Sequence, residues 1–204
     1  MPRIAVIDFE TTGLLPAMGD RATEVAIVMV EGDRVVDRFQ SLMNAGVRIP
    51  PFIESYTGIS NAMIATAPRA ESVMGDAARF VEDARMVAHN ASFDSRFWSA
   101  ELQHAGKLTA NAFACTLLLS RRLYPQAPNH KLGSLAAFHS LPSTGRAHRA
   151  MADAEVAAAL LGQIRHDIRR QYGVGECRHD LLVKVQRSAR HAMPKVIARY
   201  LQGE

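Results

Sequence analysis

Two carboxylates separated by one residue lie near the N-terminus, in the segment Asp8-Phe9-Glu10. Residues 3–9 form a short apolar run with β-branched side chains, which predicts a strand buried on both faces. Because side chains two apart on a strand share a face, Asp8 and Glu10 should project together while Phe9 points away. Such a pair repels itself, and a divalent cation such as Mg²⁺ offsets that repulsion. The alternative is a strand that ends in solvent with hydrated carboxylates.

A third carboxylate, Asp94, lies in the segment His89-Asn90-Ala91-Ser92-Phe93-Asp94. This segment follows an apolar run at 86–88, which predicts a fourth strand, and it opens a helix expected over 93–105. Ser92 is expected to cap this helix and Gly106 to end it. A carboxylate in the first turn is favoured by the helix dipole alone, so a catalytic role requires Asp94 to face the Asp8–Glu10 pair.

A histidine and a fourth carboxylate, His148 and Asp153, lie five positions apart. Five positions on an α-helix correspond to about 140° of rotation, so the two side chains act on one centre only if they are not both inside a regular helix. Gly145 supports a loop or helix entry at His148, with Asp153 on the helix that follows. Histidine titrates near neutral pH and can take a proton from water. The alternative is a solvent-facing histidine in a polar loop.

The elements that must position these residues begin with strands expected at 3–9, 23–30 and 34–43, the last two joined by the turn Glu31-Gly32-Asp33. Residues 46–68 contain three prolines and are expected to be a loop with a short helical turn. Helical spacing is found at 69–84, 93–105, 115–123, 131–140, 150–170, 179–192 and 194–202. A run of strands followed by alternating strand and helix predicts an α/β fold with a mixed sheet.

Bulk composition narrows the class of protein. The 204 residues suit one domain, and the formal charge of +4 with a pI near 9.4 favours, weakly, a polyanionic partner. Much of the basic excess lies in residues 165–204. Cys115 and Cys177 form no CxxC pattern, which favours a reducing compartment. We find neither a signal peptide nor a membrane span and expect a soluble, cytoplasmic protein that makes no use of a membrane.

Taken together, the motifs resemble those of a known family. Asp8-Phe9-Glu10-Thr11-Thr12-Gly13-Leu14, the 89–94 segment, and His148 with Asp153 are similar in order and spacing to the three exonuclease motifs of the DEDDh, or DnaQ-like, family. This family includes the proofreading epsilon subunit of bacterial DNA polymerase III. The resemblance covers residues 3–165 and includes Asn129-His130-Lys131-Leu132. It implies an RNase H-like fold, a mixed twisted sheet flanked by helices, with residues 1–170 as the exonuclease domain and 171–204 as a basic helical C-terminal extension.

The resemblance also implies a reaction. Two Mg²⁺ or Mn²⁺ ions would be held by the four carboxylates, with Asp8 bridging both ions, Glu10 and Asp153 completing one site, and Asp94 acting through bound water. His148 would be the general base. The implied enzyme is a 3′–5′ exonuclease that hydrolyses phosphodiester bonds at the 3′ end of single-stranded nucleic acid and releases nucleoside 5′-monophosphates.

Residues that bind the terminal nucleotide follow from the same resemblance. Thr11, Gly13 and Leu14 match positions that contact this nucleotide, and Asn90 and Phe93 match positions that line the same pocket. Tyr56-Thr57-Gly58-Ile59 resembles a loop that often reads His-Gly-Ile, with Thr57 in place of the histidine. Tyr56 is therefore an alternative contact that stacks on the base, or else a half-buried packing residue.

Several alternatives stay open from the sequence. DNA is favoured as substrate because the match is closest to the polymerase-associated group, and a DNA polymerase subunit is then a candidate partner. The alternatives are an RNA 3′-end trimming enzyme, a non-catalytic module that binds nucleic acid or a polymerase, and a phosphoesterase acting on small nucleotides. The sequence does not indicate an oligomeric state. Four cations of the tail either guide nucleic acid, dock a partner or face solvent: Arg187, Arg190, Lys195 and Arg199.

Overall fold

The computed structural model of the chain describes residues 3–108, 111–142 and 149–203. Its centre is a single five-stranded sheet with the strand order β3-β2-β1-β4-β5. The strands are β1 (Ile4–Thr11), β2 (Ala22–Glu31), β3 (Arg34–Leu42), β4 (Arg85–Ala88) and β5 (Phe113–Cys115). The pairs β1–β2 and β2–β3 are antiparallel, whereas β1–β4 and β4–β5 are parallel. The predicted α/β fold with a mixed sheet is confirmed.

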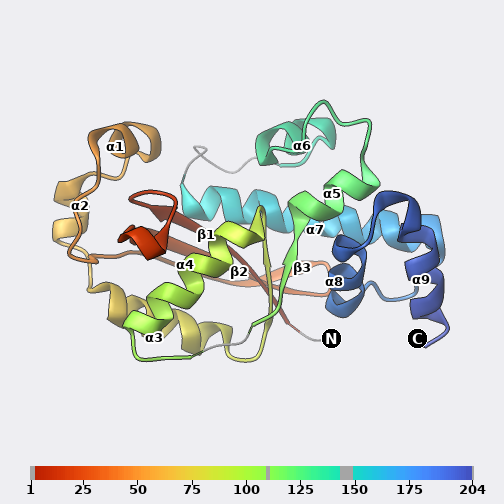
Figure 1. Cartoon of the computed structure of the whole chain (residues 1–204), viewed down its shortest axis with the longest axis horizontal. Helices are drawn as coiled ribbons and strands as arrows, with labels where there is room; N and C mark the ends of the chain where they lie inside the picture. Colours follow the sequence, from red (N-terminus) through yellow and green to blue (C-terminus); the bar gives the residue numbers. More distant parts are fainter. Residues whose placement is uncertain (1–2, 109–110, 143–148, 204) are drawn as a thin grey trace.

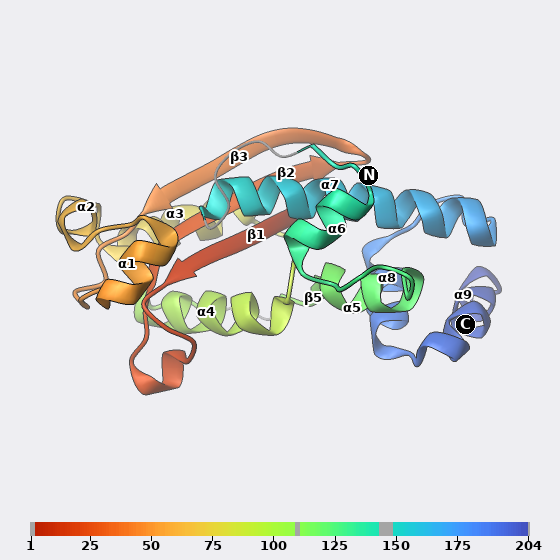
Figure 2. The ribbon, with the colours of Figure 1, turned by 90° about the horizontal axis from the view of Figure 1, so that it is seen from above.

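Helices cover both faces of the sheet, and Figure 2 shows β1 lying between α7 on one side and α4 on the other. The helices are α1 (Pro51–Thr57), α2 (Asn61–Ala65), α3 (Ala70–Val81), α4 (Ala91–His104), α5 (Thr116–Leu123), α6 (Leu132–Phe138), α7 (Ala150–Tyr172), α8 (His179–Arg187) and α9 (Met193–Leu201), with 3-10 turns η1 (Pro16–Met18) and η2 (Arg190–Ala192). Figure 1 shows α1 and α2 at one end of the molecule and α8 and α9 at the other.

Alternation along β1 produces two separate cores. Ile4 and Val6 pack with the buried side chains of α5, α7 and α8. Ala5, Ile7 and Phe9 face the other way and pack with the buried side chains of α3 and α4. Both sets are almost fully buried, because helices cover the sheet on each side. This alternation decides which face Asp8 and Glu10 share, and it is the α7 face.

The C-terminal residues join this fold. Leu181, Leu182 and Val185 of α8 are fully buried in the core that α7 forms with the sheet. The Gln186 side chain pairs with the outer edge of β5, donating to the Phe113 carbonyl at 3.0 Å and accepting from the Cys115 N–H at 2.5 Å. Part of the tail therefore packs on the domain. The division at residue 170/171 stays a prediction.

Four local expectations were wrong. Strand β5 was not predicted, because three residues are too short to show a period. Asn90, in the left-handed conformation with φ 67°, is the residue that precedes α4, so Ser92 lies inside the first turn and does not cap it. Residues 46–68, expected to be a loop with one short helical turn, hold two helices, α1 and α2. The helix expected over 179–192 ends at Arg187, where Ser188 adopts an extended conformation.

Two further expectations can be compared with the structure. Within the described residues, no helix has the length and apolar character needed to cross a membrane. Cys115 and Cys177 are both buried and free of a disulfide.

Candidate active site

Three of the predicted carboxylates converge at the end of β1. Asp8 and Glu10 share the face of β1 that α7 crosses, and Asp153 lies in the first turn of α7. Ligand oxygens of the three side chains all lie within 4.8 Å of one another. Phe9 points to the opposite face, where its ring lies 6.5 Å from that of Phe97. The period of two along the strand thus places the pair as predicted.

Asp94 lies on α4, which packs on the opposite face of β1. Strand β4 pairs with β1 only as far as Val6, so β1 continues beyond its neighbour. The chain then turns at Asn90 and α4 begins, which places Asp94, only 2% exposed, in the first turn. The Asp94 carboxylate accepts a hydrogen bond from the Phe9 backbone, and its negative charge raises the pKa of Asp8. Asp94 is therefore linked electrostatically to Asp8, whereas the ligand oxygens that lie close to one another belong to Asp8, Glu10 and Asp153.

Burial and mutual repulsion raise the pKa of several carboxylates at this centre. Burial, followed by the charges of Asp94, Glu10 and Asp153, raises the pKa of Asp8 well above its ordinary value. Burial and the charges of Asp153 and Glu24 raise the pKa of Glu10 to about 8. Burial likewise raises the pKa of Asp94 to about 8. Each charged form is unfavourable here unless a cation is added, and an all-oxygen ligand set suits a hard divalent ion.

A buried ion pair beside the centre fixes the start of α7. Glu24 lies opposite Glu10 in the β1–β2 register and is 1% exposed. It accepts hydrogen bonds from Arg149 Nη2 at 2.9 Å, from the Ala150 N–H at 3.2 Å and from Gln40 Nε2 at 2.8 Å. Since Arg149 immediately precedes α7, this pair holds the helix that carries Asp153.

The predicted nucleotide-binding turn is internally braced. The Thr11 hydroxyl donates to the Gly13 carbonyl at 2.6 Å. A Cβ on Gly13 would lie 2.4 Å from the carboxyl group of Asp20, so any other residue at this position would have to displace the Asp20 side chain. Leu14 follows the turn with 71% of its surface exposed. The turn therefore presents an apolar side chain to solvent on a fixed backbone.

The remaining predicted contacts divide into two groups. Asn90 and Tyr56 line the same cleft as Asp8 and Asp153, and Tyr56 is 53% exposed. Phe93 packs on Phe97 with ring centroids 4.9 Å apart. Thr57 is 2% exposed, and its hydroxyl donates to the Ile53 carbonyl and accepts from the Ile59 N–H. The structure thus gives Thr57 a bracing role within α1.

A cleft of about 1010 Å³ extends from the acidic centre. Asp8 and Asp153 line it together with residues of α5 and of the segment before α6. His148 lies outside the described residues, although α7 begins only at Ala150, so His148 precedes the helix on which Asp153 lies. Sequence reasoning missed Glu24 and Arg149. The available signal was a lone carboxylate in an otherwise apolar strand.

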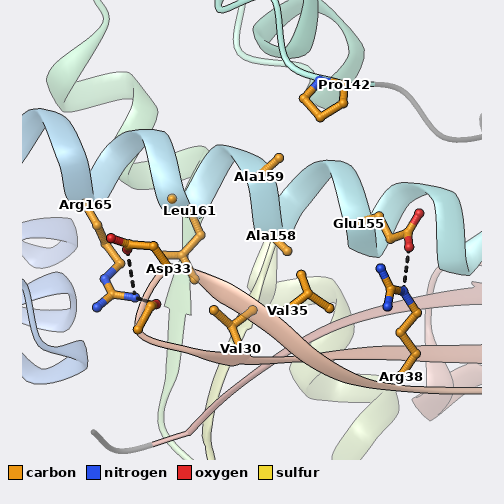
Figure 3. Close-up of a pocket in the computed structure, with 12 residues that line it drawn as sticks. Val30, Asp33, Val35, Arg38, Pro142, Glu155, Ala158, Ala159, Leu161 and Arg165 are labelled. Carbon is orange, nitrogen blue, oxygen red and sulfur yellow. Dashed lines mark hydrogen bonds and ion pairs between the residues drawn. The ribbon is translucent and has the colours of Figure 1, made fainter.

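A second hollow, of about 290 Å³, lies between the β2–β3 hairpin and α7 (Figure 3). Val30, Val35 and Leu161 line its apolar part. Ion pairs close its two ends: Arg38 Nε lies 2.7 Å from Glu155 Oε1, and Arg165 Nη1 lies 3.6 Å from Asp33 Oδ1. Both charge pairs are compensated, so this hollow lacks the unbalanced charge that distinguishes the acidic centre.

This arrangement of motifs agrees with comparisons to known proteins. A family model described as an exonuclease, RNase_T, matches residues 5–161. The chain belongs to this exonuclease family. The resemblance to DEDDh, DnaQ-like exonucleases is thereby confirmed.

Relatives of this exonuclease-family chain include proteins of replication. The DNA polymerase III subunit epsilon of Aquifex aeolicus is 33% identical over 172 residues, which are 84% of each chain. The PolC-type DNA polymerase III of Caldanaerobacter subterraneus is 36% identical over 155 residues, 76% of this chain. The chain spans only 11% of the length of that PolC-type relative.

A solved structure supports the fold of the exonuclease-family chain. The structure of exonuclease X in complex with 5′ overhanging duplex DNA superposes with a TM-score of 0.67 and 29% identity, covering 86% of this chain and 95% of that one. The RNase H-like fold implied by the motifs is confirmed.

Proposed function

We propose that the chain is a metal-dependent 3′–5′ exonuclease that hydrolyses phosphodiester bonds at the 3′ end of single-stranded DNA and releases nucleoside 5′-monophosphates. One observation carries the proposal: Asp8, Glu10 and Asp153 bring ligand oxygens within 4.8 Å of one another at the end of a cleft, in a chain of the exonuclease family. Four carboxylates gathered at one point have no use in a module that only binds a polyanion, because they repel it.

The residues fit a pair of divalent cations. The ligand set consists of carboxylate oxygens, and burial raises the pKa of Asp8, Glu10 and Asp94, so the charged forms need added positive charge. We propose that two Mg²⁺ or Mn²⁺ ions are held by these three residues and Asp153. Such ions supply Lewis acidity that generates hydroxide near neutral pH and offsets charge on the departing oxygen.

The chain's own residues have distinct tasks in this proposal. Asp8 and Glu10 are fixed by β1, and Asp153 by the first turn of α7, so the scissile phosphate meets a preorganised centre. His148 takes the proton from the attacking water, a role that rests on the family motif. Leu14, exposed on its braced turn, contacts the terminal bases together with Thr11, Gly13, Tyr56, Asn90 and Phe93, whereas the buried Thr57 supports the segment that carries Tyr56.

Single-stranded DNA is the proposed substrate on the strength of the relatives. The Aquifex aeolicus relative is named as a DNA polymerase III subunit, and the solved relative, exonuclease X, is bound to duplex DNA with a 5′ overhang. A DNA polymerase subunit is accordingly the proposed partner, and the cytoplasmic location expected from the sequence stays part of the proposal.

The test is hydrolysis of a 5′-labelled single-stranded DNA oligonucleotide with Mg²⁺ or Mn²⁺. We expect a ladder that shortens from the 3′ end, and no shortening with EDTA or with Asp8→Asn. Asp83→Asn, a matched change of an exposed carboxylate, should leave the ladder intact. Absence of shortening with the unchanged chain, on both DNA and RNA, would leave the binding-module interpretation in its place.

A second arm decides between DNA and RNA. Oligonucleotides of the same sequence in both forms are hydrolysed side by side, and discrimination depends on whether the site accepts a 2′-hydroxyl. We expect faster turnover of DNA. A preference for RNA of more than about tenfold, or 1.4 kcal/mol of transition-state stabilisation, would reassign the enzyme to RNA 3′-end trimming.

A further inference from the structure

The cleft that Asp8 and Asp153 line also carries positive charge. Its lining includes Arg121 on α5, and Asn129, Lys131 and Ser134 at the start of α6. The only carboxylates that line the cleft among the described residues are Asp8 and Asp153. A volume of about 1010 Å³ is at the upper limit for a single small ligand, roughly 300–1,000 Å³, so the cleft has room beyond the terminal nucleotide.

Arg121 and Lys131, the two cations that line the cleft, differ in their ion pairing from most buried or half-buried arginines of the molecule. Arg21, Arg149 and Arg165 each pair with a carboxylate. Arg121 and Lys131 are exposed, and within residues 3–108, 111–142 and 149–203 neither makes an ion pair. Burial lowers the pKa of His89, and the positive charge of Arg121 lowers it further. Their positive charge is therefore available to a ligand.

A half-buried histidine holds this wall of the cleft in place. His89, at the end of β4, has its pKa lowered to about 4 by burial, so its ring is neutral at neutral pH. Since a carbonyl only accepts, Nε2–H donates to the His130 carbonyl at 3.1 Å, and Nδ1 accepts from the Thr116 hydroxyl at 2.9 Å. His130 in turn bonds the Tyr124 carbonyl at 3.1 Å. The segment that carries Lys131 is thus tied to both β4 and α5.

We infer that this basic wall, formed by Arg121, Asn129, Lys131 and Ser134, binds the phosphates of the nucleotides that lie 5′ to the scissile bond. The inference rests on the proposed exonuclease function. Cations with amide and hydroxyl donors are the side chains that contact phosphate oxygens without reading bases. A single strand whose 3′ phosphodiester meets Asp8 and Asp153 must continue out of the cleft, and the residues of the basic wall line the same cleft.

The wall also explains how an acidic centre accepts a polyanion. Asp8, Glu10, Asp94 and Asp153 repel a nucleic acid backbone until cations bind. Paired arginines elsewhere cannot offset that repulsion, because their charge is already neutralised by carboxylates. Two uncompensated cations on a preorganised wall attract the upstream phosphates and lose little entropy on binding.

The experiment compares a substrate that reaches the wall with one that does not. The variant is Arg121→Ala/Lys131→Ala. Its matched control is Arg85→Ala/Lys107→Ala, which removes two exposed cations away from the cleft, Arg85 at the start of β4 and Lys107 after α4. The substrates are thymidine 5′-monophosphate p-nitrophenyl ester and oligo-dT of increasing length. Thermal unfolding verifies that each variant is folded.

We expect kcat/KM of the unchanged chain and of the control to rise with oligonucleotide length. In the wall variant this rise should flatten, with the ratio of oligonucleotide to ester turnover lowered at least about tenfold. The slope of log kcat/KM against log salt should decrease by about 1.4, or 0.7 for each phosphate contact on a single strand. An unchanged salt slope, or an equal loss of kcat/KM with the ester, would contradict phosphate binding by the wall.

The two proposals fail separately. If the unchanged chain hydrolyses neither substrate, the exonuclease function fails. The wall is then tested by binding of fluorescent oligo-dT to the Asp8→Asn chain with and without the two wall substitutions. A salt slope of binding that is lower by about 1.4 supports the wall, and equal slopes overturn it.

Discussion

Buried and half-buried carboxylates occur in this molecule in two settings that differ in the charged groups around them. Glu24 and Glu101, the paired carboxylates, are each 1% exposed and accept hydrogen bonds from a guanidinium and from a backbone N–H. Asp8, Glu10, Asp94 and Asp153 form the acidic centre. The charged groups that most affect Asp8 are all acidic, and they raise its pKa.

The two settings differ in the groups that surround the carboxylate. Glu101 binds both Nε and Nη2 of Arg21, at 3.0 and 2.9 Å, and the Ala22 N–H at 2.8 Å, so its charge is satisfied within the chain. In the acidic centre, burial and neighbouring carboxylates raise the pKa of Asp8 and of Glu10, so their ionised forms are unfavourable. The proposed divalent cations supply the positive charge that favours ionisation.

The largest expected effect is on catalysis by Asp8→Asn. Loss of one oxygen ligand that carries charge should lower kcat/KM at least about 10³-fold, since a single group that stabilises the transition state contributes at about that scale. In EDTA at alkaline pH the same variant should unfold at a higher temperature than the unchanged chain, because burial and the neighbouring carboxylates disfavour the ionised Asp8 side chain, and an amide carries no such charge. The measurements are ester hydrolysis and thermal unfolding.

Asp8→Asn should thus lower kcat/KM and raise the unfolding temperature in EDTA. These opposite signs follow from the difference between the acidic centre and the paired carboxylates. Asp83→Asn, on the surface, should change neither. If Asp8→Asn lowered stability in EDTA as well as activity, Asp8 would belong with the paired carboxylates and the distinction would be wrong.

The second effect is on stability, from Glu101→Ala. This variant leaves the Arg21 guanidinium, 13% exposed, without its carboxylate. Breaking a buried pair on one side lowers the free energy of unfolding by about 3 kcal/mol or more, measured by urea denaturation. The double variant Arg21→Met/Glu101→Leu should recover most of that loss. A loss below about 1 kcal/mol for Glu101→Ala would show that a satisfied pair contributes no more than a surface one.

The third effect couples cations to pH. Burial and neighbouring carboxylates raise the pKa of Glu10 from 4.5 to about 8 in the folded chain. Between those values the folded state binds more protons than the unfolded state, so the free energy of unfolding without cations falls as pH rises. Cations need the ionised carboxylates and stabilise by about 2.7 kcal/mol at a concentration 100 times Kd.

Thermal unfolding in fixed Mg²⁺ and in EDTA, at pH 6 and pH 8, measures this coupling. The gain from Mg²⁺ should be larger at pH 8, where fewer protons compete. Glu10→Gln should reduce the pH dependence in EDTA, because it removes one of the three carboxyl groups whose pKa is raised, and Asp8 and Asp94 still titrate. A gain that is equal at both pH values would contradict a centre whose carboxylates hold protons at pH 6.

Sequence alone predicted those parts of the site that depend on residues close together along the chain. Asp8 and Glu10 could be placed on one face because the period of a strand is local. Asp94 could be placed in a first turn, although the capping residue was wrong, since Asn90 adopts a left-handed conformation that no local pattern signals. The pair Glu24–Arg149 joins residues 125 positions apart, and its partners are defined only by the crossing of α7 over β2.

The same limit applies to the outer parts of the site. The 89–94 segment was predicted, but the bonds of His89 to Thr116 and His130 depend on how α5 and α6 return to the sheet. Thr57 matched a family position, yet its hydroxyl is occupied within α1. Local periods predict which carboxylates meet, whereas long-range packing decides which charges are neutralised.

The smallest expected effect links the two settings through Arg149. This guanidinium pairs with Glu24 and lowers the pKa of Glu10, which burial otherwise raises. Arg149→Met should therefore raise the pKa of Glu10, both by removing a positive charge and by leaving Glu24 less neutralised. Cations would then compete with protons up to a higher pH, and the acid limb of the pH–rate profile should move to higher pH, with kcat/KM near pH 7 lowered about tenfold.

Arg38→Met is the matched control for this last prediction. Arg38, on β3, pairs with Glu155 of α7, the helix that Arg149 precedes. This pair lies nearer the surface, where an ion pair contributes about 0–1 kcal/mol. We expect its acid limb to stay in place. A uniform drop in activity for Arg149→Met with an unshifted limb would mean that the pair only holds α7 in position. A shifted limb would mean that a structural ion pair also sets the charge of the acidic centre, so the two kinds of buried carboxylate are connected through one arginine.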